Sequence, residues 1–295
     1  IFSWSEGFPA EVRPGRSGQT ARIAVRSHPA KPLQGIDTHA HVFSATAPSV
    51  PGARYRPASA ATLGDWRSHW AGSTVTRGVI VQPSFFGTDN SEALAAVAAD
   101  PAHLRAVAVV DPGFGDEDLA RLAEGGVRAI RLNLKAKPDY AAFATGEWRA
   151  LYRRVHALGW HVEVHVDTGR VPDIVPAFAG SPVAVVFDHF GTPGADPAAQ
   201  DATFAAVASL SRGRPVWAKL SGPYRLAGAD PAALAAGWME TVGGDHLVWG
   251  SDWPWTNHER ENNYGRLRDA LDRWVGAEQA RAILWDNAAR LYGFA

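Results

Sequence analysis

The sequence of 295 residues has no cysteine, no long apolar run and no excess of charge of one sign. Without cysteine, disulfide bonds, thiolate metal ligands and cysteine nucleophiles are excluded. No apolar run approaches the ~20 residues of a membrane-spanning helix, so we expect no membrane contact. The 29 Lys and Arg nearly balance the 30 Asp and Glu, which argues against a nucleic-acid partner.

The first 33 residues differ in composition from the rest of the chain. They are rich in Gly, Pro, Ser and Arg and lack hydrophobic periodicity, so we expect an extended N-terminal arm over residues 1–33. They also lack the apolar segment of a secretory signal, which makes a cytoplasmic location the default expectation. Residues 34–295 are expected to form one folded domain, either as a monomer or as a homo-oligomer.

From residue 34 onward, short apolar runs alternate with longer segments rich in Ala and Leu. Eight runs predict buried strands, at residues 35–39, 77–83, 104–112, 127–134, 160–167, 183–191, 215–222 and 246–254. The clearest helices between them are predicted at 91–100, 116–124, 147–158 and 231–242. Gly159 is expected to end the third of these helices, and Asp230 with Pro231 to begin the fourth.

Eight such β/α units in one chain predict an α/β fold, a (β/α)₈ TIM barrel. An open doubly wound sheet is the alternative. It would carry a Gly-rich phosphate-binding turn after its first strand, and GIDTHAHVF has none. The barrel is therefore the favoured architecture.

Polar side chains collect at the C-terminal ends of the predicted strands. They are His39, His41, Gln82, Ser84, Asp111, Arg131, Asn133, His165, Asp167, Asp188, His189, Lys219, Ser221, Ser251 and Asp252. In a barrel of parallel strands those ends meet at one mouth, where the active site lies. The pattern therefore predicts a single polar site at the barrel mouth.

The stretch IDTHAHVF places His39 and His41 two residues apart at the end of the first predicted strand. Residues i and i+2 of a strand point to the same side, so the two imidazoles could bind one Zn²⁺ at ~2.0–2.1 Å. A pair of hydrogen-bonded pocket histidines is the alternative. His165, His189 and Asp252 follow the fifth, sixth and eighth strands and add donors to the same mouth.

This arrangement resembles the amidohydrolase superfamily, with HxH after strand one, histidines after strands five and six, and aspartate after strand eight. The segments GIDTHAHVF, VQPSFFGTDN, GVRAIRLNL, VFDHFGTP, AKLSGPYRL and VWGSDWPWTNH are similar to the amidohydrolase-2 group, especially the 2-pyrone-4,6-dicarboxylate hydrolases and related lactone hydrolases. The resemblance extends from about Gly35 to Phe294. It implies an enzyme that opens a small carboxylated lactone, pyrone dicarboxylate- or muconolactone-like, by attack of water on the ester carbonyl.

The resemblance also implies a role for each matching residue. Asp252 would be the general base that activates water, since an ordinary carboxyl group is ionised at neutral pH. His189, His39 and His41 would polarise the lactone carbonyl or hold the water. The substrate itself would be bound by a further set, Tyr55, Ser84, Arg131, Lys137 and Arg225. Lys137 stands where we expect an arginine, and a lysine lacks the guanidinium fork that binds carboxylates bidentately.

His165 is the main departure from the pyrone dicarboxylate hydrolases, in which we expect an aromatic hydroxyl and no dependence on metal. A histidine, as in the zinc-dependent members, would let His39, His41, His165 and Asp252 bind one divalent metal, with Zn²⁺ or Mn²⁺ suited to such ligands. The metal would polarise the carbonyl and lower the pKa of bound water. A metal-independent mechanism, with Asp252 as the base in a cationic pocket, is the alternative.

Three other functions fit parts of the sequence. A sugar-lactone hydrolase of the same group would need carboxylates and amides facing sugar hydroxyls, and Arg131 and Arg225 argue against it. A metal-dependent non-oxidative decarboxylase shares the superfamily fold, but such chains are usually longer. A non-catalytic barrel that binds an acid is disfavoured because all five polar residues of the mouth motif are present.

Overall fold

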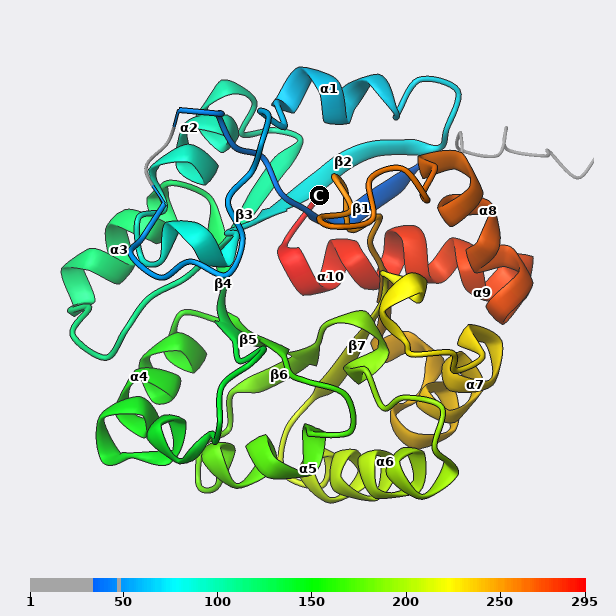
Figure 1. Ribbon diagram of the computed structural model, residues 1–295. Helices are drawn as coiled ribbons and strands as arrows, with labels where there is room; N and C mark the ends of the chain where they lie inside the picture. The colour runs from blue at the N-terminus through cyan, green and yellow to red at the C-terminus, as the bar shows by residue number, and fades with distance from the viewer. Residues whose placement is uncertain (1–33, 47–48) are drawn as a thin grey trace, which may run out of the picture. The chain divides into compact units, whose positions relative to one another are not determined.

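The computed structural model describes residues 34–46 and 49–295. The arm predicted at residues 1–33 lies outside these residues. Eight parallel strands pair in sequence order and alternate with helices, which confirms the predicted TIM barrel (Figure 1). The strands are β1 (Gly35–Ala40), β2 (Val75–Val81), β3 (Leu104–Ala108), β4 (Val127–Asn133), β5 (His161–His165), β6 (Ala184–Phe187), β7 (Val216–Leu220) and β8 (Leu247–Trp249).

The helices follow the strands in the order that the hydrophobic pattern predicts. They are α1 (Leu63–Ser68), α2 (Ser91–Ala99), α3 (Asp116–Glu124), α4 (Gly146–Ala157), α5 (Val171–Ile174), α6 (Pro197–Ser211), α7 (Pro231–Val242), α8 (Tyr264–Val275), α9 (Ala277–Arg281) and α10 (Ala288–Tyr292). The four helices predicted above are confirmed, and their bounds differ by at most one residue. The Asp230 carboxylate caps α7 by accepting a hydrogen bond from the N–H of Ala232, and Gly159 follows α4 with a left-handed φ of 70°.

The barrel is closed between β1 and the segment that follows β8. The backbone N–H of His41 donates to the carbonyl of Trp253 at 2.8 Å, and the N–H of Asp252 donates to the carbonyl of His39 at 2.8 Å. Ala40 also forms an isolated parallel bridge with Trp253. The same hydrogen bonds that close the barrel therefore hold the His39–His41 pair beside Asp252.

Helix α10 lies across the N-terminal ends of the strands (Figure 1). Tyr292 and Phe294 pack there against buried side chains from inside the barrel, such as Ile36 and Val79. This apolar layer leaves the C-terminal end of the barrel for a polar site. Among the described residues, no helix is long and apolar enough to span a membrane.

Several predicted strands are too long at their C-terminal ends, most of all the third, sixth and eighth. Strand β3 ends at Ala108, β6 at Phe187 and β8 at Trp249, whereas the predictions extended to residues 112, 191 and 254. Beyond β6 and β8 the backbone turns, with a left-handed φ of 52° at His189 and 57° at Asp252. Non-glycine residues rarely adopt this conformation, and such positions concentrate at functional sites.

Candidate active site

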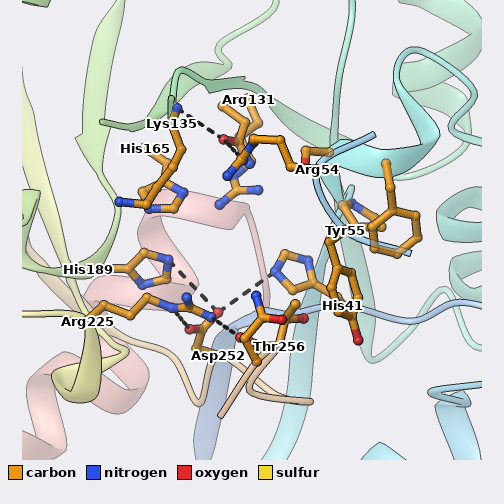
Figure 2. Close-up of a pocket in the computed structure, with 15 residues that line it drawn as sticks. His41, Arg54, Tyr55, Arg131, Lys135, His165, His189, Arg225, Asp252 and Thr256 are labelled. Carbon is orange, nitrogen blue, oxygen red and sulfur yellow. Dashed lines mark hydrogen bonds and ion pairs between the residues drawn. The ribbon is translucent and has the colours of Figure 1, made fainter. Parts of the chain in front are cut away.

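A polar pocket lies at the C-terminal ends of the strands (Figure 2). Its lining comes from the last residues of β4 and β5 and from the segments after β1, β2, β4, β6, β7 and β8. The side chains that line it are His41, Arg54, Tyr55, Pro83, Ser84, Phe85, Arg131, Asn133, Lys135, His165, His189, Arg225, Asp252, Thr256 and Asn257. Seven of the fifteen polar residues predicted to converge at the barrel mouth line this pocket.

Asp252 is the buried carboxylate of this pocket, and its two oxygens have different surroundings. Oδ2 accepts hydrogen bonds from the hydroxyl of Tyr224 and from Nε of Arg225, both at 2.6 Å. Oδ1 instead faces the Nε2 atoms of three histidines, at 3.6 Å for His39, 3.8 Å for His41 and 3.9 Å for His189. One oxygen is thus anchored, and the other is directed toward the imidazoles.

The charge on Asp252 is stabilised by its neighbours. Burial by itself raises the pKa of this carboxyl, but the Arg225 guanidinium and the surrounding imidazoles outweigh burial and hold the pKa well below its usual range. The same ion pair raises the pKa of Arg225 above its ordinary value, against the opposing effect of burial. At neutral pH the site therefore contains an ionised carboxylate.

His41 and His189 are buried beside Asp252, and burial is the main cause of their lowered pKa values. The pKa of His41 falls to about 3, with His39 and Arg131 adding to the effect of burial. The pKa of His189 is also about 3, although Asp252 opposes the decrease. His41 Nδ1 lies 2.8 Å from the carbonyl of Val81, which can only accept. The proton of neutral His41 is therefore on Nδ1, and its Nε2 presents a lone pair to the site.

Cationic side chains face this carboxylate–histidine group across the pocket. In Figure 2, Arg54, Arg131 and Lys135 lie on one side, and Asp252, His189 and His41 lie on the other. Nε of Arg131 donates to Oδ2 of Asp188 at 2.9 Å. Within residues 34–46 and 49–295, the terminal nitrogens of Arg131 have no hydrogen-bond partner. They remain available to a ligand carboxylate.

The structure places the residues predicted from the sequence in three groups. Those that line the pocket are His41, Tyr55, Ser84, Arg131, His165, His189, Arg225 and Asp252. His39 lies beneath the pocket, fully buried against Asp252. Lys137 is not part of the lining; it is exposed, and its ammonium lies 5.9 Å from the ring centre of Phe143.

The turn after β4 explains the position of Lys137. The N–H of Lys137 donates to the carbonyl of Leu134 at 3.1 Å, and Ala136 adopts a φ of 60°. This reversal leaves Lys135 in the pocket wall, where its ammonium lies 3.0 Å from Oδ1 of Asp167. A lysine is present close to the expected place, but two residues earlier in the chain.

Several pocket residues that lie in irregular segments were not predicted from the sequence. They are Arg54, Pro83, Phe85, Lys135, Thr256 and Asn257. Arg54 was adjacent to the predicted Tyr55, and its guanidinium donates to Oδ1 of Asn133 at 3.2 Å. No periodicity marks such loop positions, so only their nearness to predicted residues could have pointed to them.

Donor groups suited to a divalent metal are present in the site. The donor atoms of His39, His41 and Asp252 lie within 4.8 Å of one another, and so do those of His39, Asp188 and His189. The imidazole Nε2 of His39 is buried and, within the described part of the chain, has no hydrogen-bond partner. This set of two histidines and a carboxylate could hold one divalent ion.

His165 does not belong to either donor group found among the described residues. Its ring lies edge-on to that of His189, with 4.8 Å between the ring centroids. Burial lowers its pKa well below the usual value, and the His189 and Arg131 side chains add to the effect. The four-residue metal site expected from the sequence therefore reduces, in this geometry, to three residues without His165.

A parallel eight-stranded barrel with histidines, an aspartate and arginines at its C-terminal mouth defines the class of (β/α)₈-barrel enzymes, whose active sites lie at that end. Within that class, the chain belongs to the amidohydrolase family, whose model matches residues 36–294.

Known proteins agree with this assignment. The chain is 31% identical over 281 residues to a 2-pyrone-4,6-dicarboxylate hydrolase of Comamonas testosteroni, covering 88% of this chain and 90% of the relative. It is 28% identical over 290 residues to a 4-sulfomuconolactone hydrolase of Rhizobium radiobacter, covering 95% and 96%. A solved structure from Acinetobacter baumannii, described as a probable 2-pyrone-4,6-dicarboxylic acid hydrolase with citric acid bound, matches with a TM-score of 0.81 and 33% identity. That match covers 89% of this chain and 100% of the other.

Proposed function

We propose that this protein is a lactone hydrolase that opens a small ring bearing at least two acidic groups. The family and the activities named for its relatives support hydrolysis of a cyclic ester. The acidic substrate is supported by the free terminal nitrogens of Arg131, which lies across the pocket from Asp252. The proposal rests on one observation. Cationic side chains line one side of the pocket, and Asp252 with its neighbouring histidines lies on the other side.

In the proposed reaction, Oδ1 of Asp252 accepts a proton from water while the water oxygen bonds to the lactone carbonyl carbon. The carbonyl oxygen then carries negative charge, which N–H donors of the pocket stabilise. The carbonyl re-forms as the ring C–O bond breaks, and the leaving oxygen takes up the proton that Asp252 accepted. His41 presents a lone pair at Nε2, so it suits the water, whereas His189 lines the pocket and suits the polarisation of the carbonyl. His39 lies beneath the pocket and would act through its contact with Asp252.

The acidic groups of the substrate would be held mainly on the side of the pocket opposite Asp252. We assign this role to Arg131 and Arg54, with Lys135 in the place expected for Lys137, and to Arg225 on the Asp252 side. The Tyr55 and Ser84 hydroxyls would add hydrogen bonds to the ring or its substituents. A sugar lactone would leave these cations without partners, which disfavours that alternative.

A divalent metal, if bound, would be held by His39, His41 and Asp252. It would supply Lewis-acid polarisation of the carbonyl, and Zn²⁺ or Mn²⁺ would suit the donors. We propose that hydrolysis does not depend on it, because the site already contains an ionised base and several cations.

A panel of lactones tests this function, with unsaturated dicarboxylated rings of the kind formed in aromatic catabolism compared with muconolactones and neutral sugar lactones. Ring opening of an unsaturated lactone is followed as loss of ultraviolet absorbance, and carbon dioxide is measured in parallel. We expect turnover of the dicarboxylated rings without carbon dioxide. Release of carbon dioxide would favour the decarboxylase, and preference for sugar lactones would contradict the acidic substrate.

A further inference from the structure

A buried charged cluster lies directly beneath the pocket, inside the barrel. Its members are Lys219 on β7, Glu163 on β5, Asp188 after β6 and His39 on β1, and all four side chains are fully buried. Nζ of Lys219 lies 2.6 Å from Oε2 of Glu163 and 3.5 Å from Oδ1 of Asp188. The third neighbour of this ammonium is Nδ1 of His39, at 3.2 Å.

Hydrogen-bond chemistry fixes the direction of the Lys219–His39 contact. An ammonium group has three donors and no acceptor, so Nδ1 of His39 must accept and cannot carry a proton. The competing partner is Oδ1 of Asp188, 3.4 Å from the same Nδ1. The Lys219 contact is the shorter of the two and has hydrogen-bond geometry, whereas the Asp188 contact does not, so the geometry favours Lys219 as the partner of His39.

We propose that Lys219 is a positioning residue that fixes His39 in the tautomer with its proton on Nε2. The N–H of Nε2 is then directed toward Oδ1 of Asp252, 3.6 Å away. His41 has the opposite arrangement, because its Nδ1 donates to the Val81 carbonyl and its Nε2 carries the lone pair. The two histidines of the HxH motif thus become one donor and one acceptor facing the same carboxylate oxygen.

This inference deepens the proposed function, because it describes how the same site holds its protons without a metal. Metal-binding histidines normally donate their second ring N–H to a carboxylate or carbonyl, which leaves a lone pair for the metal. His39 faces an ammonium instead, so its Nε2 lone pair is not available. The tautomer itself does not depend on the substrate, and it can be tested even if the proposed lactone is wrong.

Glu163 holds Lys219 in this position from below. Its Oε1 accepts a hydrogen bond from the Tyr292 hydroxyl at 2.6 Å, while Oε2 contacts Lys219. Burial raises the pKa of Glu163, but Lys219 and His161 together outweigh burial and bring the pKa to about 2. Tyr292 therefore offers a matched control, because its loss loosens the same cluster without removing the contact to His39.

The direct test is the tautomer of His39, measured by ¹⁵N–¹H correlation spectra of protein labelled at histidine, with His39→Gln used for assignment. We expect the Nε2–H form in the unaltered protein and in Tyr292→Phe, and the Nδ1–H form in Lys219→Met. An Nδ1–H signal from the unaltered protein would overturn the proposal. So would an unchanged Nε2–H signal in Lys219→Met.

Removal of Lys219 alone leaves Glu163 without its cation, so the protein could fail to fold. The double variant Lys219→Met/Glu163→Gln removes both charges, and the tautomer of His39 is then measured in it by the same spectra. We expect the Nδ1–H form there as well. A second measurement is Zn²⁺ affinity by competition with a chelating dye. We expect the double variant to bind Zn²⁺ on the order of tenfold more tightly than the unaltered protein, and addition of His39→Gln to abolish the gain. Equal Zn²⁺ affinity in the double variant and the unaltered protein would contradict the role of Lys219.

Discussion

Nε of Arg225 donates a hydrogen bond of 2.6 Å to Oδ2 of Asp252, and this contact divides the carboxylate into two functional halves. Oδ2 is occupied by Arg225 and by the Tyr224 hydroxyl, while Oδ1 remains directed toward the imidazoles. Charge-assisted hydrogen bonds of this kind are short and strong. A single oxygen is therefore left for the proposed role as base, and the contacts of Oδ2 fix its direction.

Replacement of Asp252 by asparagine tests that base. We expect kcat to fall by roughly 10²- to 10⁴-fold, because the amide cannot accept a proton from water, while substrate binding is retained. The measurement is steady-state kinetics with the preferred lactone of the panel, together with binding by calorimetry. Tyr224→Phe is the matched control, since it removes one hydrogen bond to Oδ2 and keeps the carboxylate. Near-full activity of Asp252→Asn would show that another group is the base.

The pH dependence of the rate tests the Arg225–Asp252 pair. In the unaltered protein the pKa of Asp252 lies well below its usual range, so kcat/KM should show no loss from this group between about pH 5 and 8. In Arg225→Met the cation is absent and burial raises the pKa of Asp252, so activity should be lost as the pH falls through the raised value. Identical acid limbs in the two proteins would contradict this account. KM for dicarboxylated lactones should also rise, with little change for neutral ones.

Substitutions of Arg54 and Lys137 test whether the substrate binds in the pocket seen in the structure or in the one expected from the sequence. Arg54 lines the pocket and Lys137 does not. We expect Arg54→Met to raise KM for a dicarboxylated lactone by about tenfold, as a charge-assisted hydrogen bond of ~1.5 kcal/mol would give. Lys137→Met should change KM by less than about twofold, as is usual for a solvated charge. Initial-rate measurements in which Lys137→Met raises KM more than Arg54→Met would show that Lys137, and not Arg54, binds the substrate.

The buried histidines should make the protein less stable at mildly acidic pH. His41 and His189 have pKa values of about 3 in the folded protein, below the ~6.5 of an unfolded chain. Below pH ~6.5 the unfolded state therefore binds more protons, and the free energy of unfolding should fall by about 1.4 kcal/mol per pH unit for each such histidine. Urea unfolding at pH 7.5, 6.5 and 5.5 measures the slope. A flat profile would mean that these imidazoles are not held neutral.

Chelation tests whether the reaction depends on metal. If Asp252 and the cations suffice, protein dialysed against a strong chelator should keep its kcat/KM, and added Zn²⁺ or Mn²⁺ should not raise it. Elemental analysis of the dialysed sample confirms that metal has been removed. Loss of activity on chelation, with recovery on adding one equivalent of metal, would establish a metal-dependent mechanism at the same pocket.

Much of the fold could be predicted because the barrel is built from local patterns. Buried parallel strands need β-branched apolar runs, and helices need capping residues such as Asp230 at their first turn. The ends of β6 and β8 were predicted less well. After these strands the backbone turns, with positive φ at His189 and Asp252. The hydrophobic pattern of the side chains does not predict a backbone turn of this kind.

The sequence by itself determined the eight β/α units and the histidines and aspartate that end them, because each is carried by residues close together in the chain. Contacts between distant segments were decided only by the tertiary structure. Barrel closure places Asp252 beside His39, and Lys219 reaches the same imidazole from 180 residues away. The turn after β4 selects Lys135 rather than Lys137 for the pocket wall. The partner of a side chain, and which of the two donates the hydrogen bond, depend on how distant segments pack together. The spacing of residues along one strand does not determine either.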